Sequence, residues 1–90
     1  MKASAALAEE IAAACAAKMQ ELGVATMSFD DQANGMSASA LRPEALADFF
    51  ARYVPRIRDV EYERQTGYAQ IIATARWPMG TWSQSWDCLA

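Results

Sequence analysis

The spacing of apolar residues predicts a helix over residues 3–22. Bulky apolar side chains recur there every three or four residues, as they do along one face of a helix. Gly23 follows at the position where a helix commonly ends in a left-handed residue. The predicted stripe consists of Leu7, Ile11, Cys15, Met19 and Leu22.

After this glycine the apolar pattern changes to a period of two residues, which is typical of strands. Residues 24–30 alternate in this way, and so do residues 36–40. Between them stands Asn34-Gly35, a pair that tolerates the positive φ angles of a type I′ turn. The two segments are therefore predicted to form a β-hairpin.

The triplet Arg-Pro-Glu at residues 42–44 predicts the start of a second helix. Proline is preorganised for the first helical position, and glutamate suits the positive end of the helix dipole. Pro55 is expected to end this helix at about residue 53 or 54, because a residue before proline disfavours the helical conformation. The wide apolar face comprises Leu46, Phe49, Phe50, Tyr53 and Val54.

The last third of the chain alternates again and predicts a three-stranded meander. Its strands are residues 58–65, 68–77 and 81–88, with turn signals at Thr66-Gly67 and at residues 78–80. The predicted order is α-β-β-α-β-β-β, an α+β fold with an antiparallel sheet and two helices packed on one face. Residues 1–90 are expected to form a single domain, because a chain of this length suffices for one core and not two.

Charge narrows the range of partners. The net charge is -3, and no lysine follows Lys18. A nucleic-acid-binding surface needs clustered cations, so nucleic acid is not the expected partner, although the arginines at positions 42, 52, 56 and 58 are where it would bind. Glu9 and Glu10 interrupt the alanine-rich N-terminal run and argue against a signal peptide or a membrane span.

Catalytic and metal-binding chemistry has few candidate residues. The sequence holds no histidine, which removes Ser–His and Cys–His mechanisms and histidine-bound metals. Asp30 and Asp31 are neighbours, but adjacent strand residues point to opposite faces, and aspartate before a turn commonly bonds to local backbone. We expect no catalytic residue, no metal, no cofactor and hence no enzyme.

Two cysteines, Cys15 and Cys88, are present without a CxxC pair. This usage favours a reducing, cytoplasmic setting, with Cys15 acting as a small apolar residue of the first helix. Whether the two cysteines pair is left open.

Arg52, Arg56 and Arg58 cluster at the end of the predicted second helix and form a weak candidate anion site. Cations are favoured at the negative end of a helix dipole, and arginine can clamp a phosphate or carboxylate. Ion pairs of Arg58 or Arg64 with acids on adjacent strands are the alternative interpretation.

Three tryptophans lie within the last fourteen residues. Tryptophan is enriched both in small cores and at binding hot spots. Trp82, Gln84 and Trp86 share one face of the last predicted strand, and a terminal strand is often an edge that another chain can join. With Trp77 they are the candidate partner-binding residues, core packing being the alternative.

These features favour a non-enzymatic protein-binding module: a small acidic inhibitor, adaptor or accessory protein, of the kind phages and mobile elements encode, acting by surface occlusion. The protein partner is unidentified, and a homodimer is an open alternative because a small sheet with an edge strand gains buried area by pairing.

The alternative function is a ligand-binding or enzymatic domain with a pocket between the second helix and the sheet. The predicted element order and the segment at residues 43–50 resemble part of the cone-shaped NTF2-like fold, which has a pocket of this type. The chain is shorter than that family and lacks its helical pair and any matched catalytic motif, so no site residue is transferred. The expected lining is Phe49, Tyr53, Tyr62 and Trp77, with Asp30 or a tyrosine as the polar group.

Overall fold

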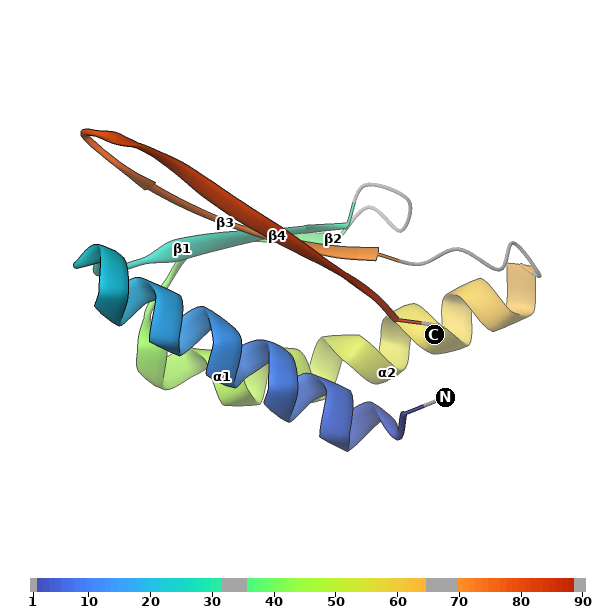
Figure 1. Cartoon of the computed structure of the whole chain (residues 1–90). Coiled ribbons are helices and arrows are strands. Elements are labelled where there is room, and N and C mark those ends of the chain that lie inside the picture. The colour runs from blue at the N-terminus through green and yellow to red at the C-terminus, as the bar shows by residue number, and fades with distance from the viewer. Residues whose placement is uncertain (1, 32–35, 65–69, 89–90) are drawn as a thin grey trace.

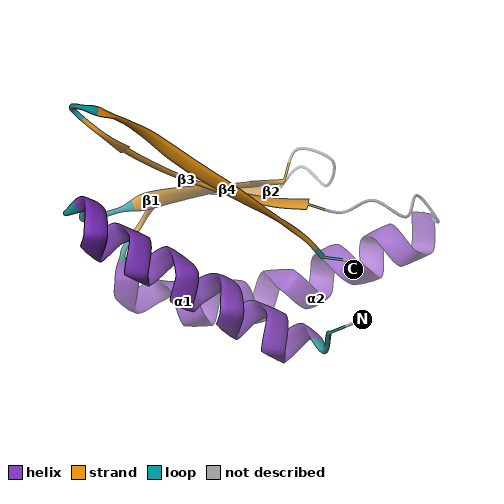
Figure 2. Ribbon diagram, viewed as in Figure 1, coloured by secondary structure: helices purple, strands orange, loops and turns teal. Residues whose placement is uncertain are grey.

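Two helices lie on one face of an antiparallel sheet in the computed structural model of the chain (Figures 1 and 2). The structure describes residues 2–31, 36–64 and 70–88, and within these ranges the sheet has four strands. The helices are α1 (Ser4–Leu22) and α2 (Leu46–Arg64), with a short 3-10 helix η2 (Pro43–Ala45) leading into α2. The strands are β1 (Met27–Asp31), β2 (Met36–Leu41), β3 (Gln70–Trp77) and β4 (Gly80–Asp87).

The order of strands across the sheet is β2-β1-β3-β4, so that β2 and β4 are its edges. β1 pairs antiparallel with β2 and with β3, and β3 pairs antiparallel with β4. The α+β class, the antiparallel sheet and the two helices on one face are therefore confirmed. The first hairpin is confirmed as well, whereas the predicted Asn34-Gly35 and Thr66-Gly67 turns lie outside the described residues.

Helix α1 ends as the sequence predicts. Gly23 has φ 68° and ψ 29°, which is left-handed backbone that glycine adopts without steric cost. Its N–H donates to the Gln20 carbonyl at 3.3 Å, and the Val24 N–H donates to the Met19 carbonyl at 3.1 Å. These two bonds form a Schellman motif, which satisfies carbonyls that the helix end would otherwise leave unpaired.

Helix α2 is longer than predicted, and the strand predicted at residues 58–65 is wrong. Pro55 lies inside α2, which continues to Arg64. An internal proline costs about 3 kcal/mol. Val54 and Ile57 are fully buried beside it, and each buried aliphatic side chain contributes roughly 1.5–3 kcal/mol. The buried face of α2 therefore outweighs the local disruption, and the helix passes through the proline.

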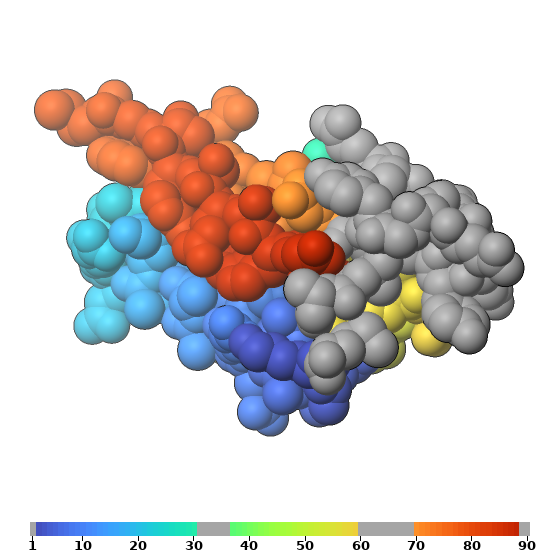
Figure 3. Space-filling model, turned by 45° about the vertical axis from the view of Figure 1, so that its right-hand side comes forward, coloured from blue at the N-terminus to red at the C-terminus, as the bar shows by residue number. Residues whose placement is uncertain are grey.

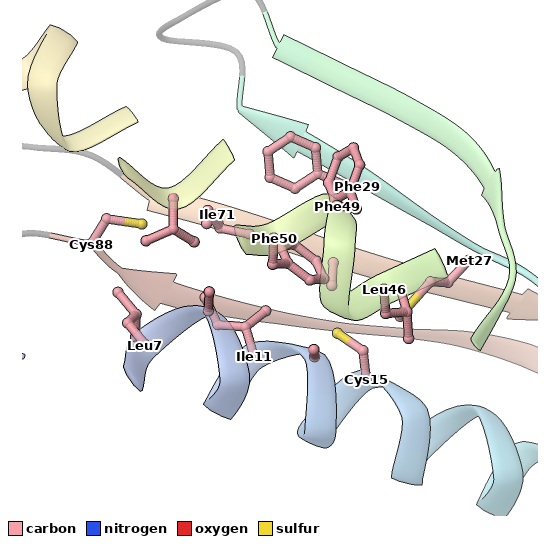
Figure 4. Close-up of a cluster of buried hydrophobic side chains, with 14 of the residues drawn as sticks. Leu7, Ile11, Cys15, Met27, Phe29, Leu46, Phe49, Phe50, Ile71 and Cys88 are labelled. Atoms are coloured by element: carbon pink, nitrogen blue, oxygen red, sulfur yellow. The ribbon is translucent and has the colours of Figure 1, made fainter. Parts of the chain in front are cut away.

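The hydrophobic core fills the space between the helices and the sheet (Figure 4). Phe29 of β1 packs edge-to-face against Phe49 and Phe50 of α2, with ring centroids 5.0 and 5.8 Å apart. The helices also pack against each other, with Ile11 and Cys15 of α1 facing α2. The predicted apolar residues of the two helices are thus confirmed as core or as partly buried residues packed against it, and Met27 and Ile57 are buried in the same core.

Candidate partner-binding edge

The β3–β4 hairpin is regular from its turn to its end. Its pairing starts at Trp77 and Gly80, which flank a two-residue turn, and continues without a break to Gln70 and Asp87. Residues that flank such a turn exchange both of their backbone hydrogen bonds. Because the bonds alternate along an antiparallel pair, every second residue of β4, Gln84 among them, directs its N–H and C=O groups toward β3.

The intervening residues of β4 direct their backbone groups away from the sheet. These residues are Thr81, Ser83, Ser85 and Asp87, and all four are exposed. Among the described residues β4 has β3 as its only strand neighbour. Figure 3 shows the strand lying at the surface next to α1. This row of outward-facing donors and acceptors is called the β4 edge below.

The predicted partner-binding residues lie on the helix-facing side of β4 and β3. Trp82 and Trp86 are half-buried and pack against the core, and Gln84 between them is exposed. The Lys18 ammonium nitrogen lies 5.7 Å from the centroid of the Trp82 ring, within the range of a cation–π interaction. One part of each tryptophan therefore packs against the core, and the rest stays accessible.

Trp77 lies at the turn of the hairpin, where it pairs with Gly80. Trp82 pairs with Ala75, two residues earlier on β3, so Trp77 and Trp82 are diagonal neighbours on one face of the hairpin. The turn rises away from the helices (Figure 1), and Trp77 there is half-buried. The Cβ that an alanine at position 80 would carry would lie 3.2 Å from the Trp77 ring, so the ring packs closely over Gly80. Trp77 thus supports the turn from which β4 starts.

Arg58 ties the end of β4 to both helices. Its side chain is 9% exposed; its Nε donates to the Cys88 carbonyl, directly after β4. Its Nη1 donates to the Lys2 carbonyl and, at 3.3 Å, to the Ser4 hydroxyl at the start of α1. Its Nη2 is buried without a hydrogen-bond partner. Sequence reasoning missed this role because it placed Arg58 on a strand, although Phe50 and Val54 precede it at the four-residue spacing of one helix face.

The three arginines of the predicted anion site divide between two faces of α2, because Arg52 and Arg56 are one helical turn apart and Arg58 lies on another face. Arg58 points inward, whereas Arg52 and Arg56 are exposed. The Nε of Arg52 donates to the Asp48 carbonyl of the same helix at 3.4 Å. Outside this group, Arg42 contacts the Glu44 carboxylate at 2.9 Å. A backbone hydrogen bond and, to a smaller extent, this contact with Arg42 lower the pKa of Glu44. The structure therefore does not bring the three side chains of the anion site together.

The region proposed for an NTF2-like pocket holds packed aromatic rings. Phe49 and Tyr53 have ring centroids 4.4 Å apart, and Phe29 lies 6.0 Å from Tyr53. Trp77 lies at the hairpin turn, four residues along β3 from Ala73, which pairs with Phe29. The side chain of Tyr62 lies outside the described residues. The rings that were expected to line a cavity thus contact one another.

Cys15 and Cys88 are both buried, and no disulfide joins them. Burial raises the pKa of the Cys15 thiol to about 12, because a thiolate would lose its hydration there. A thiol with so high a pKa stays protonated at neutral pH and reacts slowly. Cys15 therefore acts as a core residue, as the sequence predicts.

No protein-family model, curated protein or solved structure matches the chain. Within the described ranges, histidine, cysteine and carboxylate side chains nowhere gather in threes close enough to hold a metal ion. Neither α1 nor α2, over the residues described, has a stretch both long and apolar enough to cross a membrane.

Proposed function

We propose that the chain is a non-enzymatic protein-binding module, an inhibitor, adaptor or accessory protein that binds an extended segment of a partner protein along the β4 edge. The observation that supports this proposal is that β4 is a regular edge strand without protecting residues. β4 pairs with β3 without a bulge over its whole length. It contains no proline, lysine or arginine, which are the residues that commonly protect an edge from pairing with another strand.

Strand addition divides affinity and specificity between backbone and side chains. The outward backbone groups of Thr81, Ser83 and Ser85 supply hydrogen bonds to any extended segment. The accessible parts of Trp82 and Trp86 supply aromatic contacts on the helix side of the sheet. An occupied edge would also cover the bound segment of the partner, which is how a small module acts by occlusion.

The proposal places the module in a reducing compartment, the cytoplasm. Two buried thiols that are not joined to each other are typical of proteins that fold without disulfides.

Substitutions of Ser83 test the proposal, because valine keeps the outward backbone N–H at this position and proline removes it. Ser83→Pro removes an outward N–H and leaves the β3–β4 bonds in place, as proline is tolerated on the open side of an edge strand. Ser83→Val keeps the N–H and favours a strand. A partner captured from lysate by the wild type and by Ser83→Val should be lost with Ser83→Pro, and the purified pair should bind at least about tenfold more weakly.

Circular dichroism and thermal unfolding establish that all three proteins are folded. Equal affinity of the purified partner for the wild type, Ser83→Val and Ser83→Pro would contradict the proposal.

A further inference from the structure

We infer that the segment bound along the β4 edge is β4 of a second copy of the chain, paired antiparallel in a register centred on Gln84. The inference rests on the proposed function and names its partner. Its basis is the internal symmetry of β4: the segment Trp82-Ser83-Gln84-Ser85-Trp86 reads the same in both directions.

A two-fold axis through an antiparallel strand pair places residues at equal distances before and after the centre opposite each other. With Gln84 at the centre, Trp82 lies opposite Trp86 of the partner subunit, and Ser83 lies opposite Ser85 of the partner subunit. The same residue types therefore meet on both sides of the axis. Aromatic pairs and hydroxyl pairs at directly opposed positions are among the combinations that stabilise sheets.

The direction of the backbone groups fits this register. Ser83 and Ser85 point their backbone N–H and C=O groups outward. Ser83 therefore exchanges backbone hydrogen bonds with Ser85 of the partner subunit, and Ser85 does so with Ser83 of the partner subunit. The backbone N–H and C=O groups of Gln84 point toward β3, so Gln84 and Gln84 of the partner subunit face each other without backbone hydrogen bonds between them. Such a pair has its Cα atoms about 4.5 Å apart, closer than in a hydrogen-bonded pair.

Charge does not oppose the pairing. The single ionisable side chain of β4 is that of Asp87, and the register places it opposite the neutral Thr81 of the partner subunit. Like charges directly opposite each other would destabilise a strand pair, and none meet here within β4. This matters for a chain that carries a net charge of -3.

The resulting assembly joins two four-stranded sheets edge to edge. Because the two-fold axis is perpendicular to the sheet, the helices of both copies lie on the same side, and the opposed tryptophans lie there as well. Both β4 edges become covered, and the outer edges of the joined sheet are the two β2 strands, whose pairing with β1 is interrupted by a register shift. A bulged strand at each outer edge limits further growth.

Site-directed cross-linking tests the register. The Cα spacing of the central pair lies within the range that a disulfide spans, so Gln84→Cys under mild oxidation should give a disulfide-linked dimer in high yield. Ser83→Cys alone should cross-link poorly, because its opposite residue is Ser85. An equimolar mixture of Ser83→Cys and Ser85→Cys should restore the cross-link. The wild type, whose Cys15 and Cys88 are buried, is the background control.

Sedimentation equilibrium without cross-linking measures the association itself. The wild type and Ser83→Val should shift with concentration toward twice 9.9 kDa over the micromolar range, and Ser83→Pro should stay monomeric. A wild type that is monomeric throughout, or a Gln84→Cys variant that cross-links no better than the wild type, would overturn the inference.

The two proposals can fail separately. A monomeric chain whose β4 edge captures a different protein, with capture lost in Ser83→Pro, would overturn the second copy as partner and leave the proposed function standing. A dimer that Ser83→Pro leaves intact would overturn the β4 interface.

Discussion

β2 and β4 are the two edges of one sheet, yet only β4 is regular. The pairing of β1 with β2 shifts between Met27 and Phe29, so that Ser28 stands opposite both Ser39 and Ala40. Ala40 has φ 56°, a left-handed conformation that is unusual for a residue other than glycine. β4 shows neither feature. A bulge disrupts the row of outward hydrogen-bonding groups, whereas a regular edge presents it intact.

The two edges also differ in what their side chains offer. Between its end residues Met36 and Leu41, β2 carries only serine and alanine, and Ser37, Ser39 and Ala40 are exposed. β4 carries two tryptophans that are half-buried and half accessible. An incoming strand would therefore find both an intact backbone and large aromatic contacts at β4 and neither at β2. Edge position alone therefore does not distinguish the two strands; regularity and side-chain size do.

Gln84→Pro should produce the largest effect, since it breaks the inner side of β4. The Gln84 N–H belongs to the ladder with β3, where Ala73 is its fully buried partner residue. Loss of that bond and the clash of the ring are expected to lower the free energy of unfolding by about 3 kcal/mol. Ser83→Pro should cost less than about 1 kcal/mol. Urea denaturation measures both, and equal losses would show that the backbone directions are assigned the wrong way round.

Arg58→Met should detach the end of β4 from α2. Hydrogen bonds from a charged donor contribute about 1.5–3 kcal/mol each, and relief of a buried charge offsets part of their loss, so we expect a decrease of about 2 kcal/mol. Amide hydrogen exchange should rise near Cys88 and remain unchanged in β2. Arg52→Met makes the same substitution on the exposed face of α2 and should change stability by under about 0.5 kcal/mol. Equal effects of the two substitutions would refute the anchoring role.

Gly80→Ala should disturb the start of β4. The new Cβ would lie 3.2 Å from the Trp77 ring, which must move to accommodate it, at an expected cost of about 1 kcal/mol. Tryptophan fluorescence should change together with the unfolding midpoint. Thr81→Ala, at the exposed neighbouring position, serves as the control and should leave the fluorescence unaltered. An unchanged midpoint in Gly80→Ala would mean that the ring does not support the turn.

Ala40→Gly should have the smallest effect, and it should be stabilising. Left-handed backbone costs a non-glycine residue about 1–2 kcal/mol, while glycine adds about 0.5–1 kcal/mol of unfolded-state entropy. The net gain is expected to be about 0.5–1 kcal/mol. Ala38→Gly, in the regularly paired part of β2, should instead lose about 1 kcal/mol. Thermal unfolding distinguishes the two signs, and a loss in both would show that the bulge carries no strain.

The candidate site was predictable in part. The tryptophans and Gln84 were singled out because an aromatic strand near the chain end favours an edge, and β4 is an edge. The anchoring role of Arg58 was not predictable, because its acceptors at Lys2 and Cys88 are distant in sequence and meet it only in the folded chain. The three arginines do not form one cluster for a related reason, since Arg58 is close in sequence to Arg52 and Arg56 but lies on a different face of the same helix.

The sequence by itself determined α1 with its glycine stop, both hairpins and the symmetry of β4, because these depend on interactions within a few residues. Tertiary structure alone decided that residues 58–64 are helical, that β2 and β4 are the edges and that the β2 edge is bulged. The alternation of Val60 and Tyr62 resembled a strand, but burial of Val54 and Ile57 against the sheet and α1 extended the helix through Pro55. Contacts between distant segments supply that free energy, and no local stretch of sequence contains it.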